Sequence, residues 1–295
     1  AKSYEWVNDT TLKFELKEGL TFHNGEKLDA DDVVFTYNWV ADPANGVKTQ
    51  QNVSWIDSAE KTGPYSVQVN LKEPFPAALE FVSGALPIYP EEYYKEVGPD
   101  GMGLKPIGSG PYMITNVEPG REITWKKFDN YMTDSPKGQP QIGTVIQRTI
   151  PERNTQIAEL LAGKADWMWR VPADQAERLA AGGKVTIVNE QTFRIGYLTL
   201  DAAGTTGDTP LKDVRVRQAI NYAIDRGAIV EALVRGKSEV VNAACFPSQF
   251  GCTKDVTVYE YNPEKAKALL AEAGYPDGFT IDFYAYRNRD YAEAM

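Results

Sequence analysis

The feature that most constrains the fold is a change of pattern at residue 143, after which short strand patterns alternate with helix patterns. The residue patterns predict strands over 144–150, 165–169, 185–190 and 194–201, with helices over 152–161 and 172–181. Pro151 is placed to occupy the first position of its helix, and Gly163 is placed to end it. Alternation of this kind is typical of an α/β fold.

The first 142 residues contain strands, hairpins and a capped helix. Alternating apolar residues predict a half-buried strand over 11–17, and Asn24-Gly25 marks a tight turn after the following strand signal. Asp29 is the predicted N-cap of a helix with acids in its first turn. Two hairpins are predicted, with strands over 53–59 and 65–71, and over 112–117 and 122–128.

The last third of the chain is rich in helix signals. The segment 202–210 is rich in Gly and Thr and is the best linker candidate. Helices are predicted over 213–224, after a cap at Asp225 and over 262–274, and a strand over 279–285. The chain starts without Met, and Ala292–Met295 read as the middle of a helix, so we expect a fragment of a longer protein.

Charge and hydropathy argue against several classes of function. With 31 Lys and Arg against 41 Asp and Glu the formal net charge is −10, and no basic block is present, which disfavours nucleic acids and anionic membranes as partners. The longest apolar stretches, such as 85–89, are far shorter than the ~18 residues of a transmembrane helix. The start, Ala1–Trp6, carries no secretory signal.

The residues available for catalysis are few. His23 is the single histidine, and it lies more than two hundred residues from Cys245 and Cys252, which disfavours a zinc site. No Gly-x-Ser-x-Gly elbow supports a serine nucleophile, and no complete phosphate-binding loop is present. We expect a structural or surface role for His23. Paired carboxylates leave a glycosidase-like enzyme open.

The two cysteines enclose a short segment with Pro and Gly, Cys245–Cys252. A disulfide can close such a loop, and it would indicate an oxidising compartment. The alternative is a pair of free, buried thiols.

Six motifs in a fixed order carry a resemblance to a known family. They are 16–25 (LKEGLTFHNG), 28–35 (LDADDVVF), 106–112 (PIGSGPY), 210–220 (PLKDVRVRQAI), 221–225 (NYAID) and 261–270 (YNPEKAKALL). In this order they resemble the peptide- and nickel-binding family of extracytoplasmic solute-binding proteins, which serve ABC importers.

The resemblance implies an α/β fold of the periplasmic-binding-protein type, a two-lobed clamp (type II). One lobe would be nearly complete in this chain and the second truncated. The implied domains are 1–104, an extra subdomain of lobe one; 105–204, the α/β core of lobe one; and 205–295, the hinge crossing and the start of lobe two. The linker candidate 202–210 falls where this family places its hinge crossing.

The implied function is a solute receptor and not an enzyme. It would bind a peptide or similar small polar solute between its lobes and deliver it to the membrane permease subunits of an ABC transporter. The resemblance implies a periplasmic or extracytoplasmic monomer, associated with the membrane through the transporter, without cofactor, metal site or nucleic-acid partner. Peptides, nickel complexes, sugars and opines all remain open as ligands.

Candidate ligand-binding residues lie at the ends of the predicted strands, because open α/β sheets bind ligands beyond their carboxyl edges. They are Trp167, Trp169, Arg170, Phe193, Arg194 and Tyr197. A core tryptophan pair is the structural alternative for the first two. Arg194 would bind a ligand carboxylate, or would pair with Glu190 or Asp201.

Most of the motif residues have structural explanations. Asp31 and Asp32 are first-turn acids, and Arg215 and Arg217 flank an amphipathic helix where surface pairing is usual. Two rival functions remain. Acidic charge and abundant Tyr and Trp suggest a secreted carbohydrate-active enzyme, and a chaperone-like binder of unfolded peptides would differ from the receptor only in ligand size and selectivity.

The cysteine pair yields a direct test. If Cys245 and Cys252 form a disulfide, thiol titration of the unfolded protein detects no reactive thiol without reductant and two after reduction. Two reactive thiols in the unfolded, unreduced protein would contradict the disulfide.

Overall fold

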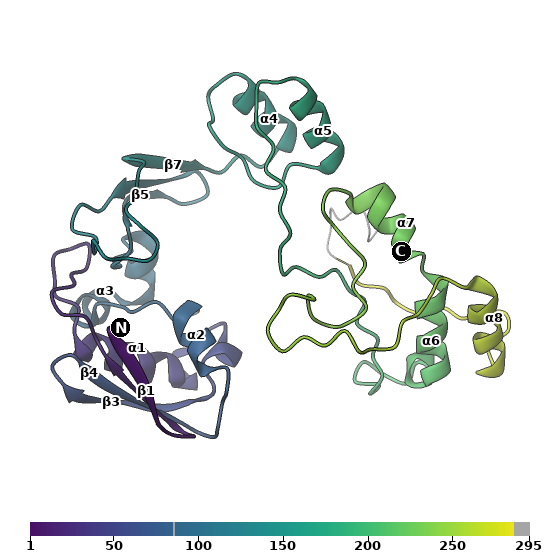
Figure 1. The fold of residues 1–295 in the computed structure, drawn as a ribbon, viewed down its shortest axis with the longest axis horizontal. Helices are drawn as coiled ribbons and strands as arrows, with labels where there is room; N and C mark the ends of the chain where they lie inside the picture. The colour runs from purple at the N-terminus through teal and green to yellow at the C-terminus, as the bar shows by residue number, and fades with distance from the viewer. Residues whose placement is uncertain (85, 286–295) are drawn as a thin grey trace. The chain divides into compact units, whose positions relative to one another are not determined.

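The computed structural model describes residues 1–84 and 86–285 and forms two compact units, Ala1–Arg153 (unit 1) and Asn154–Met295 (unit 2) (Figure 1). The predicted helix around Ala292–Met295 lies outside the described residues. Helices and strands both contribute to the fold, and the strands of the described part lie in unit 1.

Unit 1 is built on a four-stranded antiparallel sheet with the order β1-β2-β4-β3. The register places Leu12 opposite Val69 and Phe14 opposite Val67, so that these side chains share one buried face. Helix α1, Ala30–Ala41, packs on that face (Figure 1). The strands are β1 Ser3–Asn8, β2 Thr11–Glu15, β3 Ile56–Gly63 and β4 Ser66–Leu71, which confirms the predicted strand and the first hairpin.

The start of α1 is fixed by two aspartates. The Asp29 side chain accepts the Asp31 N–H, and the Asp32 carboxylate accepts the Asp29 N–H at 3.0 Å, which completes a capping box. The buried Asp32 also accepts the Glu91 N–H at 2.9 Å, at the start of α3, Glu91–Leu104. Burial raises the pKa of the Asp32 carboxyl, although its two backbone hydrogen bonds oppose that rise.

A second antiparallel sheet completes unit 1, with the order β5-β6-β7. Its strands are β5 Tyr112–Glu118, β6 Glu122–Lys127 and β7 Thr144–Arg148, which confirms the second predicted hairpin and the strand after residue 143. The short helix α2 spans Ala78–Gly84.

Unit 2 is made of short helices. Asp225 is the predicted cap, and Asp213 and Asn262 stand at predicted helix starts. Asp213, Asp225 and Asn262 each accept a backbone N–H of the helix that follows. The helices are α4 Arg153–Leu161, α5 Ala173–Ala181, α6 Val214–Ala223, α7 Arg226–Ile229 and α8 Pro263–Glu272, with a 3-10 turn at Pro210–Lys212 and a π-helical turn at Val230–Val234. Helix α4 begins two residues after Pro151, so Pro151 does not occupy its first position.

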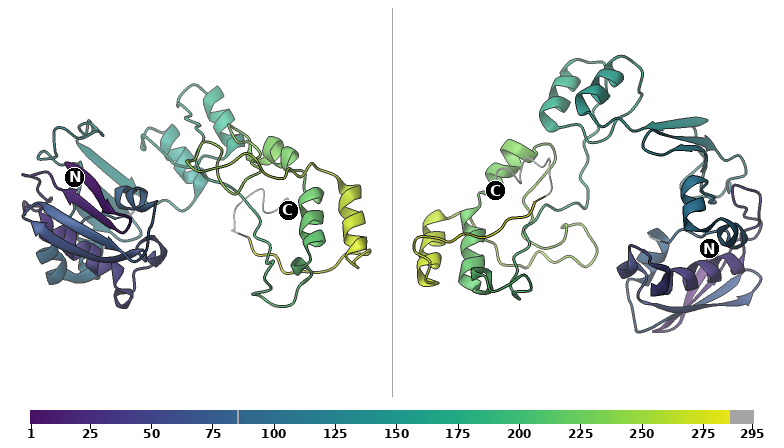
Figure 2. Two further views of the ribbon diagram at one scale, coloured as in Figure 1. Left: turned by 60° about the horizontal axis from the view of Figure 1, so that its bottom comes forward. Right: turned by 180° about the vertical axis from the view of Figure 1, so that it is seen from behind.

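Helices α6 and α8 lie side by side (Figure 1 and Figure 2). Val216 and Ala219 of α6 and Ala266 of α8 are buried. The Arg215 guanidinium donates to the Glu272 carbonyl at 2.6 Å and so caps the end of α8. Arg217 donates to the carbonyls of the Pro210–Lys212 turn. Arg215 also pairs with the Asp213 carboxylate at 2.6 Å, which is the expected surface pairing. Both arginines therefore have structural roles, as expected, and Arg217 binds backbone carbonyls.

Four predicted strands are wrong. Residues 165–169, 185–190, 194–201 and 279–285 run as irregular chain, and no strand occurs between residues 154 and 285. A strand exists only where a neighbouring strand pairs with its backbone, and these segments have no such neighbour in the described chain. The apolar side chains of 194–200 line a cavity and do not face a sheet.

The segment 202–210, predicted as a linker, begins with a tightly bonded loop. The Asp201 carboxylate accepts four hydrogen bonds, from the backbone N–H and the hydroxyl of both Thr205 and Thr206, at 2.6–3.0 Å. These bonds, above all the one from the Thr206 hydroxyl, hold the pKa of Asp201 far below its usual range. Side-chain bonding therefore gives this Gly-rich segment a defined conformation.

Replacing Asp32 is expected to destabilise unit 1. Asp32→Ala leaves two backbone N–H groups without their acceptor, which should lower the free energy of unfolding by about 2 kcal/mol. Asp31→Ala is the matched control, because it removes the exposed ion pair with Lys61, whose loss should cost much less stability. Urea unfolding followed by tryptophan fluorescence measures both values. Equal losses would contradict the role given to Asp32.

The Asp201 loop is expected to resist acid. Its folded pKa lies below the unfolded value of about 3.9, so the stabilisation is complete above that value and is lost as the pH falls through the lowered folded pKa. NMR should find the Thr205 and Thr206 amide signals unchanged at a pH of about 3.9, with Asp201→Asn shifting them at every pH. A titration of these amides centred at or above about 3.9 would contradict the account.

Candidate functional site

Unit 2 contains a cavity of about 740 Å³, which is within the size range of pockets for small ligands. Its walls come from the segment 189–200, the end of α6, helix α7 with the π-helical turn, and the segment 237–246. The apolar lining is formed by Ile195, Leu198, Leu200, Ile220, Ile224, Ile229, Val230 and Val234. Polar groups border this apolar surface, an arrangement that suits an organic solute carrying a charge.

Contacts between the two irregular wall segments hold one side of the cavity. Lys237 Nζ pairs with a Glu190 carboxylate oxygen at 2.8 Å, and the Gln191 side-chain amide donates to the Lys237 carbonyl at 3.4 Å. The Asn189 side chain packs directly on Gly236, whose φ is +65°. A Cβ at position 236 would displace the Asn189 amide, and the positive φ strains any residue other than glycine there.

Arg226 holds the other side. Its guanidinium donates to the Asn242 side-chain oxygen at 3.2 Å and to the Tyr259 carbonyl at 2.6 Å. Its position at the start of α7 is set by the Asp225 cap. Arg226 is therefore engaged in holding the wall, which removes it as a ligand-binding cation.

Arg194 also lines the cavity but, unlike Arg226, it does not hold a wall among the described residues. Within the described chain its guanidinium has no hydrogen-bond or ion-pair partner, and only its backbone N–H is bonded, to the Thr192 hydroxyl. The two acids that sequence offered as partners are occupied, since Glu190 pairs with Lys237 and Asp201 binds Thr205 and Thr206. A guanidinium of this kind is suited to bidentate binding of a carboxylate.

Two further predicted site residues lie near Arg194. Tyr197 lines the same cavity and is 77% exposed. The exposed Phe193 packs against Phe246, which also lines the cavity, with ring centroids 5.9 Å apart. The structure thus brings Phe193, Arg194 and Tyr197 to one site.

The remaining predicted residues lie elsewhere in unit 2. Trp167 and Trp169 contact each other with centroids 5.7 Å apart, and both are exposed, at 72% and 60%, so they do not form a core pair. Arg170 adopts a φ of +61°, which is uncommon for a residue with a Cβ. None of the three lines the cavity. Their role in ligand binding stays a prediction.

Sequence reasoning missed Asn189, Arg226, Lys237 and Phe246. The close packing of Asn189 on Gly236 has no sequence signature. The structure joins Cys245 and Cys252 in a disulfide, with Cα atoms 5.7 Å apart, directly beside Phe246.

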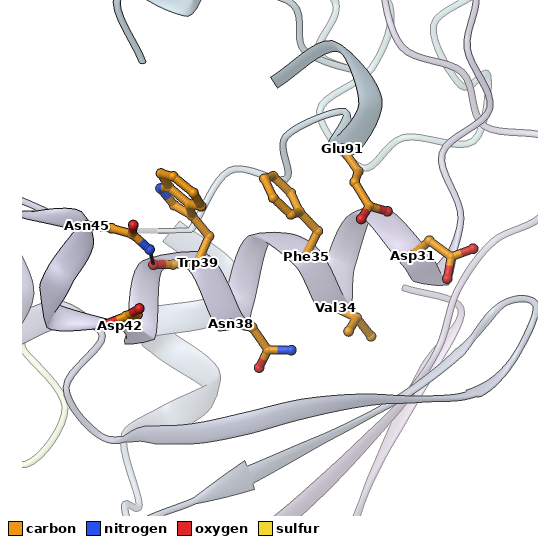
Figure 3. A pocket seen from close by; sticks show the side chains of 8 residues that line it. All are labelled: Asp31, Val34, Phe35, Asn38, Trp39, Asp42, Asn45 and Glu91. Carbon is orange, nitrogen blue, oxygen red and sulfur yellow. Dashed lines mark hydrogen bonds between the residues drawn. The ribbon is translucent and has the colours of Figure 1, made fainter. Parts of the chain in front are cut away.

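A second, shallower pocket of about 500 Å³ lies on α1 of unit 1 (Figure 3). Phe35 and Trp39 project on the side of the helix that faces Glu91 (Figure 3). Two of its three acids are paired within unit 1, since Asp31 binds Lys61 and Glu91 binds Lys95, each at 2.6 Å, and the third, Asp42, accepts the Ala44 N–H at 2.9 Å. This pocket therefore offers a ligand fewer free polar groups than the cavity in unit 2.

His23 has the structural role predicted for it. Its ring nitrogens lie 3.0 Å from the Gly110 carbonyl and 3.3 Å from the Gly108 N–H, and its ring packs on Phe128 at 4.9 Å. Since the Gly108 N–H must donate to Nδ1, the proton sits on Nε2 and is donated to Gly110. Within residues 1–84 and 86–285, no group of three His, Cys, Asp or Glu side chains is placed to hold a metal ion.

Comparison with known proteins identifies the family. The model of the bacterial extracellular solute-binding proteins, family 5, middle region, matches residues 1–295. The chain belongs to this family. The structure is also similar to a solved solute-binding protein, which confirms the predicted fold. NikZ from Campylobacter jejuni, in complex with Ni(L-His), superposes on this chain with a TM-score of 0.77 at 26% identity. The match covers 92% of this chain and 54% of NikZ.

The curated relatives of this chain are named for different solutes. A dipeptide-binding protein of Escherichia coli is 30% identical over 97% of this chain and 56% of its own length. Heme-binding protein A of Haemophilus influenzae is 28% identical over 96% of this chain and 55% of its own length. The chain thus spans about half the length of these relatives. They are binding proteins, and none of them supports a carbohydrate-active enzyme.

Across the described residues, the helices all fall short of the length and apolar character needed to cross a bilayer.

Proposed function

We propose that this chain is part of a receptor that captures a peptide or another small polar solute and delivers it to the permease subunits of an ABC importer. The observation that carries the proposal is Arg194, a guanidinium with no partner in the described chain, beside an apolar cavity of solute size in a member of family 5. A named dipeptide-binding relative supports peptides as one ligand class.

The receptor is proposed to act as a monomer in the periplasm, or outside the cytoplasmic membrane, as the extracellular family assignment suggests. In the whole protein, lobe closure over the solute would select the liganded state. The division into 1–104, 105–204 and 205–295 remains our proposal for how the chain contributes to the lobes. No step of the proposed function requires catalysis.

Ligand contacts are proposed for Arg194, Phe193 and Tyr197 at the cavity. Arg194 would take the solute carboxylate, and Tyr197 would offer a hydroxyl and a ring at the same site. Trp167, Trp169 and Arg170 are proposed to add contacts in the whole protein.

A thermal-shift panel of dipeptides, oligopeptides, opines and a nickel–histidine complex tests the proposal. At least one compound should raise the melting temperature, because a ligand that binds only the folded state stabilises it by about 2.7 kcal/mol at a hundred times its Kd. Arg194→Gln should weaken the binding of a carboxylate-bearing compound about tenfold or more. Arg178→Gln, on the exposed side of α5, is the matched control and should leave the affinity unchanged. A panel without stabilisation would overturn the proposal.

A further inference from the structure

The wall segment 237–246 has no regular secondary structure, although it lines the cavity along most of its length. It must therefore be held in place by side-chain contacts. Two of these contacts are the Lys237–Glu190 ion pair at its start and the Arg226–Asn242 hydrogen bond midway. At its far end the Cys245–Cys252 disulfide is the corresponding anchor.

Phe246 is the cavity-lining residue closest in sequence to that anchor. It follows Cys245 directly, and its carbonyl accepts the Gln249 N–H at 2.8 Å, while the Cys252 N–H binds the Gln249 carbonyl at 3.1 Å. The disulfide closes these turns into a ring, so the backbone of Phe246 is held from both sides. After Cys252 the chain is joined to the cavity wall again at Tyr259, whose carbonyl accepts a hydrogen bond from Arg226.

The ring of Phe246 also meets the part of the site that carries the free charge. It packs on Phe193, and Phe193 is the chain neighbour of Arg194. Phe246 and Arg194 line the same cavity, so this aromatic ring and the guanidinium proposed to take the solute carboxylate border one space. A solute bound there would place the group next to its carboxylate against the Phe246 ring.

We propose that the Cys245–Cys252 disulfide positions Phe246 as a specificity-determining wall of the cavity, which selects carboxylates bearing a neighbouring aromatic or large apolar group. This inference rests on the proposed function, because it assigns a solute class to the same site. Phe246 touches the solute, and the disulfide acts through Phe246 as a positioning element. Opening the disulfide frees the end of the wall segment and weakens the selection.

The experiment compares Gly-Phe with Gly-Gly by isothermal titration calorimetry. The two dipeptides share both charged ends and differ only in the benzyl group. The oxidised protein should bind Gly-Phe about tenfold more tightly than Gly-Gly. Phe246→Ala should reduce this preference to about twofold or less, while Phe246→Tyr, which keeps the ring, should preserve it.

The disulfide is tested in two independent ways. The double variant Cys245→Ser with Cys252→Ser should lose the preference for Gly-Phe while still binding Gly-Gly. Treatment of the folded wild-type protein with a dithiol should have the same effect: the cystine takes up two electrons and two protons to give two thiols, and the dithiol is oxidised to its cyclic disulfide. Phe250→Ala is the matched control, since Phe250 is in the same loop but 97% exposed, and it should retain the full preference.

The outcomes separate the two proposals. Equal affinities for the two dipeptides, or a preference that survives both Phe246→Ala and opening of the disulfide, would overturn this inference and leave solute binding intact. Loss of Gly-Gly binding in step with Gly-Phe binding would also overturn it, because the role of the disulfide would then be structural only. A wild-type protein that binds neither dipeptide overturns this inference, and the compound panel decides the proposed function separately.

Discussion

Backbone groups without a neighbouring strand must be held by side chains, and this constraint shapes the candidate site. The cavity walls of unit 2 run as irregular chain, so their conformation depends on individual contacts. The walls are held by an ion pair of Lys237, the hydrogen bonds of Arg226 and a disulfide. The first two contacts occupy the charged groups of Lys237, Glu190 and Arg226. The Arg194 side chain lines the cavity without a partner in the described chain. The cavity therefore has an unpaired guanidinium for a ligand because these other charged side chains are used to hold its walls.

Unit 1 presents the opposite case. The four-stranded sheet pairs its own backbone groups, and α1 buries an apolar face on it. Polar side chains of unit 1 therefore bond helix starts and turns and are not needed to hold irregular walls. Asp32 joins the starts of two helices, and His23 joins the turn at Gly25 to the segment before β5. Much of what makes the sequence recognisable as family 5 lies in such residues. This explains why family membership can be read from the chain.

Sequence predicted what depends on local chemistry. Helix caps such as Asp29 and Asp225 need only the next few residues to bond, and both were predicted correctly. The strands predicted after residue 160 failed, because a strand depends on a partner that local pattern does not reveal. For the site, Arg194 and Tyr197 were reached through the strand-edge argument even though no strand forms there. Lys237 and Arg226 were missed, since their contacts join segments 47 residues apart for Lys237 and 16 and 33 residues apart for Arg226.

The central claim is that this protein holds a solute. Native mass spectrometry of the protein purified without unfolding, compared with the same sample after denaturation, tests that claim most directly. The account predicts an excess mass that disappears on denaturation, with a ladder of masses for mixed peptides and a single value for one small compound. Identical native and denatured masses would contradict it.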